Sequence, residues 1–207
     1  MHSNFLRRSP TTAGAHQALN KVYDAQAPLP AWVKNLTRIV VAVDPTVVTG
    51  KDTDECGIIV AGMGRNGRGY VLDDLSARMS PAQWGAVAVG ACHRYGTRRL
   101  VIEINMGGAL VTDVIRSIDS TLNMEPIRAV KGKALRAEPV AALYEQQKII
   151  HLEHLRNGPL EKQMVEWTAD MKKSPDRLDA LVYAISDLFF TPVVRAYRYI
   201  PEEIETA

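Results

Sequence analysis

The chain has little cysteine and almost no net charge. Its two cysteines, Cys56 and Cys92, lie far apart and neither belongs to a C-x-x-C pair. This argues against a zinc site and against a disulfide framework, and it fits a reducing cytoplasm. The formal net charge of +2 over 207 residues is too small to indicate nucleic-acid binding by itself, so any basic surface must be local.

Long apolar runs and a phosphate loop are missing as well. The opening stretch, MHSNFLRRSPTTAGAHQALN, has no apolar signal-peptide core, and no later run approaches the roughly 18 apolar residues of a membrane span. The Gly-Lys pairs at Gly50 and Gly132 do not fit the pattern G-x-x-x-x-G-K-[ST]. We therefore expect no export by a classical signal, no membrane insertion and no ATP hydrolysis by this chain.

The composition is that of an ordinary globular protein. With 46% apolar and 23% charged residues, the chain is long enough for one domain with a full core. Residues 1–36 show no strong periodicity and are read as a leader or linker segment. We expect the domain itself to span residues 37–192, followed by a tail at 193–207.

The first half of that domain predicts alternating secondary structure. Apolar runs predict three strands, and Asn66-Gly67 between the second and third predicts an antiparallel hairpin. Helices and strands then alternate, which gives the order β-β-β-α-β-α-β and an α/β fold with a central mixed five-stranded sheet flanked by helices. The strands are expected within 38–44, 56–64, 69–75, 98–105 and 125–132, and the helices within 80–96 and 107–122.

The second half is mostly helical. Residues 136–147 and 160–170 predict helices, and 148–155 predict a short strand or an extended segment. Residues 174–190 carry the clearest helix signal, with Ser174 as its cap, Pro175 opening it and an apolar stripe along one face.

Four carboxylates stand where chemistry is possible. Asp44 ends the buried run RIVVAVDP, Glu103 lies inside LVIEIN, and Asp176 and Asp179 are three residues apart near the start of the last helix. Ligand-binding residues in α/β sheets gather at the carboxyl ends of strands. Clustered carboxylates suit two divalent ions, Mg²⁺ or Mn²⁺, of the kind that hydrolyse phosphodiesters.

Each acid also has a structural explanation. Asp-Pro is a common turn opener, so Asp44 could belong to a turn. Glu103 could pair with Arg98 or Arg99, and an aspartate at position 176 favours a helix start. The neighbouring Asp54 and Glu55 fit a solvated loop better than the site, and His151 and His154, which lack other metal-ligand partners, fit surface or hydrogen-bonded histidines.

A local basic cluster follows the last predicted strand of the first half. It could contact DNA phosphates near the acids or be a solvated charge run. Since the sequence shows no aromatic ladder for base stacking, contacts to the DNA backbone with low sequence specificity are the better expectation. The cluster consists of Arg128, Lys131, Lys133 and Arg136.

The acids and the strand order together resemble the ribonuclease H-like nuclease fold. The segments VAVDP, DECGIIVAG, YVLDDLSARMSPAQW, IEINMGGALV, KALRAEPVAALYEQQKIIH and SPDRLDALVYAI resemble the C-terminal nuclease domain of phage terminase large subunits over roughly residues 37–190. The resemblance implies that Asp44, Glu103 and Asp179 form the family's metal-binding triad. It also implies that Asp176 occupies a position that often carries a further acid or a histidine, and that KALRA is a functional motif.

That resemblance implies a role in viral genome packaging. The expected activity is metal-dependent endonucleolytic cleavage of concatemeric double-stranded DNA in the host bacterial cytoplasm. The expected partners are the terminase ATPase domain, the small terminase subunit and the portal protein. Two alternatives stay open: a junction resolvase or transposase of the same superfamily, and a DNA-docking module whose cleavage is suppressed in isolation.

Overall fold

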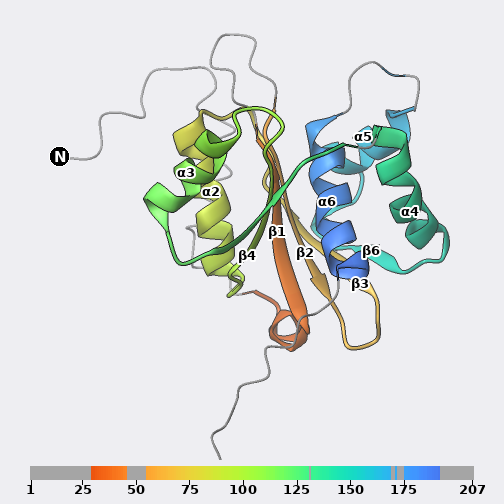
Figure 1. Ribbon diagram of the computed structural model, residues 1–207. Coiled ribbons are helices and arrows are strands. Elements are labelled where there is room, and N and C mark those ends of the chain that lie inside the picture. The colour runs from red at the N-terminus through yellow and green to blue at the C-terminus, as the bar shows by residue number, and fades with distance from the viewer. Residues whose placement is uncertain (1–28, 46–54, 131, 169–170, 172–174, 192–207) are drawn as a thin grey trace, which may run out of the picture.

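A mixed sheet of six strands forms the centre of the structure (Figure 1). The computed structural model describes residues 29–45, 55–130, 132–168, 171 and 175–191. Of the sequence-based expectations, residues 1–28 of the leader, the tail at 193–207, Asp54, Lys131 and Ser174 lie outside these ranges.

The sheet has the strand order β5-β4-β1-β2-β3-β6. β2 pairs antiparallel with both β1 and β3. The other three pairs are parallel: β4 with β1, β5 with β4, and β6 with β3. The strands are β1 (Arg38–Asp44), β2 (Gly57–Met63), β3 (Gly69–Asp74), β4 (Arg99–Glu103), β5 (Asn123–Ile127) and β6 (Ile149–His151).

The α/β class and the order of the elements are confirmed, but the expected count of five strands is wrong. The sixth strand, β6, has three residues and adds to the outer edge of β3 through the pairing of Gly69 with Ile149 and Val71 with His151. A segment this short carries no period-2 pattern of its own. The expectation of a short strand or an extended segment within 148–155 is confirmed, but its pairing with the outer edge of β3 was not predicted.

Helices cover both faces of the sheet (Figure 1). The pair α2 and α3 lies on one face, and α4, α5 and α6 lie on the other, with α6 packed over β1 and β2. Two short 3-10 helices, η1 and η2, complete the described chain. The helices are η1 (Ala31–Asn35), α2 (Pro81–Arg94), α3 (Ala109–Ile118), α4 (Lys133–Glu145), η2 (Glu153–Leu155), α5 (Pro159–Glu166) and α6 (Asp176–Phe190).

The two-sided burial of β1 explains its unbroken apolar run. Val41 and Val43 pack into the core under α2, whereas Val40 and Ala42 pack into the core under α6. Because successive side chains of a strand point to opposite faces, a strand covered on both sides needs apolar residues at every position. The run ends at the carboxyl end of β1, and there the chain places Asp44.

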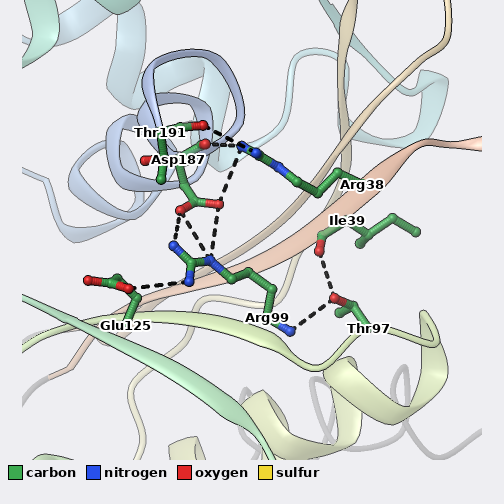
Figure 2. Close-up of polar contacts among 7 residues, drawn as sticks. All are labelled: Arg38, Ile39, Thr97, Arg99, Glu125, Asp187 and Thr191. Atoms are coloured by element: carbon green, nitrogen blue, oxygen red, sulfur yellow. Dashed lines mark hydrogen bonds and ion pairs between the residues drawn. The ribbon is translucent and has the colours of Figure 1, made fainter. Parts of the chain in front are cut away.

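The C-terminal end of α6 is fixed to the sheet by a buried carboxylate. Figure 2 shows Asp187 between two arginines, with Arg99 donating to Oδ1 at 2.6 Å and Arg38 standing 3.7 Å from Oδ2. Arg38 also donates to the backbone carbonyls of Asp187 and Thr191, and Arg99 reaches Glu125 at 3.3 Å. Because Arg38 and Arg99 open β1 and β4, this network holds α6 at the sheet edge opposite to Asp44.

No helix among the described residues is both long enough and apolar enough to cross a membrane.

Candidate active site

Asp44 and Glu103 meet at one edge of the sheet. Each is the last residue of its strand, and the parallel register of β1 and β4, which pairs Val43 with Ile102, places them side by side. Glu103 acts on the carboxyl group of Asp44 through both its charge and its hydrogen-bonding capacity. Asp44 therefore belongs to the strand end, and not to a turn.

The first turn of α6 brings two more acids to the same edge. Asp176 and Asp179 both lie in that turn and both act electrostatically on Asp44. A helix N-terminus stabilises negative charge, so this is a favourable place for carboxylates. The helix begins at Asp176 with Pro175 as its N-cap, one residue later than the proline-initiated start that the sequence predicts.

Burial and the surrounding negative charge raise the pKa of Asp44 to about 10, far above its ordinary value. The largest cause is burial, followed by the hydrogen bond to Glu103, the charge of Glu103 and the charges of Asp179 and Asp176. Carboxylates held this close disfavour one another's ionised form unless a cation neutralises them. The other three acids thus act on Asp44, and a metal-binding role of the four stays a prediction.

Asp179 is also contacted by two cations of α4. Its Oδ2 lies 2.9 Å from Nζ of Lys133, and its Oδ1 lies 3.5 Å from Nη2 of Arg136. Within the described ranges, no group of three or more His, Cys, Asp or Glu residues is arranged so that it could hold a metal ion directly. The carboxylate of Asp179 is instead shared between the acidic group and α4.

Tyr183 is a site residue that the sequence analysis did not identify. It is buried one helical turn after Asp179, and its hydroxyl is hydrogen-bonded to Arg136, whose guanidinium lies 5.2 Å from the ring centroid. Burial and the charges of Glu103 and Asp44 raise its pKa. The spacing of four residues from Asp179 on one helix was the available signal.

The alternative partners of Glu103 are engaged elsewhere. Arg99 binds Asp187 and Glu125, and Arg98 donates to the carbonyl oxygen of Thr121. Arg99 and Glu103 stand at opposite ends of β4, about 13 Å apart at 3.3 Å per residue. A structural ion pair between Glu103 and these arginines is therefore not formed.

The basic cluster divides between the site and the surface. Lys133 and Arg136 reach Asp179 from the first turn of α4, whereas Arg128 is exposed on the connection between β5 and α4. Lys131 lies outside the described residues. The DNA-contact role of the cluster stays a prediction.

Glu55 is a structural residue, so its interpretation as part of a solvated loop is wrong. Arg177 is buried and donates to both carboxylate oxygens of Glu55, at 2.8 and 3.0 Å, and to Oδ2 of Asp74 at 2.7 Å. This network joins the start of α6 to the segment before β2 and to the end of β3. The sequence signal was an arginine between two site acids in an amphipathic helix, but its partners were invisible.

Gly57 sets the distance between the sheet and α6. It pairs across β1 and β2 with Asp44. A Cβ at this position would overlap the carbonyl oxygen of Asp176 and stand 2.6 Å from its carbonyl carbon. Because Gly57 has no Cβ, the backbone of α6 can approach β2 closely, next to the strand that ends at Asp44.

We predict that Gly57→Ala pushes the first turn of α6 away from β2 by about 1 Å, because backbone atoms cannot rotate out of the way. A misplacement of that size costs about 100-fold in rate, and overpacking costs about 1–3 kcal/mol in the free energy of unfolding. Urea denaturation and plasmid nicking measure the two effects. Unchanged stability together with unchanged nicking would contradict the positioning role.

The two histidines have protein partners. Nε2 of His151 is 2.7 Å from the hydroxyl of Tyr144, its Nδ1 is 3.0 Å from Oε1 of Glu161, and Nε2 of His154 is 3.6 Å from Oδ1 of Asp73. Burial lowers the pKa of His151. Both histidines lie in structural contacts, as expected of residues outside a metal site.

Three antiparallel strands, alternating helices and parallel strands, and acids at the ends of β1, β4 and the start of α6 define a ribonuclease H-like α/β protein. A family model described as the terminase RNaseH-like domain matches residues 41–188, which is more than half of the chain. The chain therefore belongs to this family of terminase domains. A search of curated proteins found no match.

Solved structures agree on the fold. The large terminase nuclease from thermophilic phage G20c matches with a TM-score of 0.56 at 13% identity, over 72% of this chain and 81% of that chain. The human cytomegalovirus terminase nuclease domain, solved after a manganese soak with an inhibitor bound, matches with a TM-score of 0.50 at 16% identity, over 83% of this chain and 93% of that chain. The yeast mitochondrial Holliday junction resolvase Ydc2 matches with a TM-score of 0.50 at 10% identity, over 83% of this chain and 85% of that chain.

The donor chemistry of the site fits hard divalent cations. Asp44 and Glu103 end neighbouring parallel strands, so both offer carboxylate oxygens at the same place, and burial together with the neighbouring Glu103 raises the pKa of Asp44. Oxygen ligands of this kind are those that Mg²⁺ and Mn²⁺ prefer. Asp176 and Asp179 would supply the remaining protein oxygens.

Proposed function

We propose that this domain is a metal-dependent DNA endonuclease that cleaves concatemeric double-stranded DNA during viral genome packaging. The observation that carries the proposal is the parallel register of β1 and β4, which places Asp44 and Glu103 side by side at the ends of the two strands, where Asp176 and Asp179 also act on Asp44. The family supports a nuclease, and the donor set supports two divalent ions, Mg²⁺ or Mn²⁺.

The residues of the chain have distinct tasks in this proposal. Asp44, Glu103, Asp179 and Asp176 would hold the ions, and bound ions of this kind would supply activation of a water and stabilisation of the leaving oxygen of a phosphodiester. Hydrolysis forms a bond from the oxygen of water to phosphorus, breaks one bridging P–O bond and leaves a phosphate and a hydroxyl end.

The basic side chains beside the acids would orient the DNA. Lys133 and Arg136 on α4 stand next to Asp179, and Arg128 and Lys131 lie on the connection that precedes α4. Contacts to phosphate position a duplex without reading its sequence. Low sequence specificity follows from such backbone contacts.

The proposed biological setting is the one that the family name implies. The partners would be the terminase ATPase domain, the small terminase subunit and the portal protein, in the cytoplasm of a bacterial host. A docking role without cleavage and a preference for branched DNA are the competing outcomes of the experiment below.

The test is plasmid cleavage by the purified chain in Mn²⁺, Mg²⁺ or EDTA, beside a Glu103→Gln protein prepared identically. We expect nicking and linearisation in Mn²⁺ or Mg²⁺ and none in EDTA. The variant is expected to lose more than about 100-fold in rate, since mutating a residue that only hydrogen-bonds to a metal ligand already costs about 10–100-fold in activity or metal affinity. Equal cutting by both proteins would indicate a contaminant. Absence of cutting by both would favour docking, and faster cutting of a four-way junction than of linear duplex would favour a resolvase.

A further inference from the structure

The two carboxylate oxygens of Asp179 face α4. Oδ2 accepts from Nζ of Lys133 at 2.9 Å, and Oδ1 stands 3.5 Å from Nη2 of Arg136. The side chain of Asp179 is 7% exposed. A carboxylate this buried needs compensating charge, and the two cations of α4 provide it.

The two cations differ in how firmly they are held. The side chain of Arg136 is 15% exposed, hydrogen-bonded to the hydroxyl of Tyr183 and stacked over its ring at 5.2 Å. The side chain of Lys133 is 48% exposed and stands at the first residue of α4. Lys133 can therefore turn into solvent by rotating its flexible stem, whereas Arg136 is fixed by its aromatic neighbour.

A divalent cation and Lys133 compete for the same atom. A cation ligated by Oδ2 would share that oxygen with the ammonium of Lys133, which lies 2.9 Å from it. Two positive charges at such separation repel each other. An ion bound to Asp179 together with Asp44 and Glu103 would therefore release Lys133 from its ion pair.

We propose that Lys133 couples cation binding to DNA binding: it holds Asp179 until a divalent cation displaces it, and the released ammonium then contacts a DNA phosphate. The inference rests on the proposed nuclease function, since it takes Asp179 as a metal ligand. Thermodynamic reciprocity requires that cation and DNA then strengthen each other's binding by the same factor. Lys133 is a positioning and coupling residue in this scheme, and Arg136 stays in place beside Tyr183.

The first measurement is Mn²⁺ binding to the full chain by isothermal titration calorimetry without DNA, after dialysis against EDTA and back into buffer. The proteins are the wild type, Lys133→Met, and Lys148→Met as a matched control at an exposed lysine just past the other end of α4. Lys133→Met is expected to bind Mn²⁺ about 5-fold or more tightly than the wild type, the lower end of typical coupling between sites. Lys148→Met is expected to stay within about 2-fold, because an exposed charge about 20 Å along α4 from Lys133 is screened.

The second measurement is binding of a short random-sequence duplex by fluorescence anisotropy, with and without Ca²⁺ at constant ionic strength and with intact DNA verified on a gel. Ca²⁺ is used because it prefers the same oxygen ligands. The wild type is expected to gain DNA affinity on adding Ca²⁺, and Lys133→Met is expected to lose most of that gain. Lys133→Arg, which retains the charge, is expected to keep the gain.

Equal Mn²⁺ affinities of the wild type and Lys133→Met would overturn the proposal. An increase in Mn²⁺ affinity in Lys148→Met equal to that in Lys133→Met would also overturn it, since that would indicate a general effect of charge and not competition for Oδ2. These readouts involve no cleavage, so they are separable from the nuclease test. A failure of the nuclease assignment appears as cutting that survives Glu103→Gln, whatever the Mn²⁺ titrations show.

Discussion

Replacing Asp44 with asparagine is expected to lower plasmid nicking in Mn²⁺ by more than about 100-fold while leaving the fold intact. Asparagine has the size of aspartate, and its amide can donate to Glu103, so the contact between β1 and β4 survives. The substitution removes a negative charge from the group formed with Glu103, Asp176 and Asp179. The remaining acids therefore attract cations less strongly, and the repulsion among the acids also falls.

Two readouts separate a lost ligand from a damaged protein. The thermal midpoint of Asp44→Asn is expected to equal or exceed that of the wild type when both are measured in EDTA. The rise of that midpoint on adding Mn²⁺, which the wild type owes to preferential binding by the folded state, is expected to shrink or vanish. A variant that keeps its Mn²⁺-dependent rise and its nicking rate would remove Asp44 from the metal site.

The second large effect concerns stability. Arg177→Met is expected to lower the free energy of unfolding by about 3–5 kcal/mol, because it leaves two acids without their shared cation in a largely buried place. Glu55 and Asp74 accept three hydrogen bonds from Arg177. At about 2–4 °C per kcal/mol for a domain of this size, the midpoint falls by about 6–20 °C.

Two further variants test that reasoning in the same denaturation experiment. Arg156→Met removes an exposed arginine that pairs with Glu153 three residues earlier at 3.2 Å, and such surface pairs contribute about 0–1 kcal/mol. Combining Arg177→Met with Glu55→Gln and Asp74→Asn removes all three charges and is expected to recover much of the loss. If Arg177→Met alone costs no more than Arg156→Met, the network does not fix the start of α6.

The local sequence determined most of the secondary structure for identifiable reasons. Asn66-Gly67 specified the hairpin, since Gly67 adopts the positive φ of 74° that the turn needs. Ser80 and Gln83 form a capping box around Pro81 at the start of α2. These signals act over a few residues, so they can be seen without knowing the fold.

The acids of the candidate site were predictable for a different reason. An unbroken apolar run predicts a strand covered on both faces, and a carboxylate at its end, as at Asp44, then lies at the sheet edge. Glu103 ends the neighbouring parallel strand in the same way. Asp176 and Asp179 were marked by their place in a strongly amphipathic helix.

The tertiary structure alone decided what surrounds those acids. Arg177 finds Glu55 and Asp74 across 122 and 103 residues, and Lys133 finds Asp179 across 46. Such contacts depend on which helices cover which face, and a single sequence has no local pattern that encodes this. The sequence by itself thus determined most strands and helices and the position of the acids along the chain. The packing of α4 and α6 against the sheet decided which basic side chains pair with which acids.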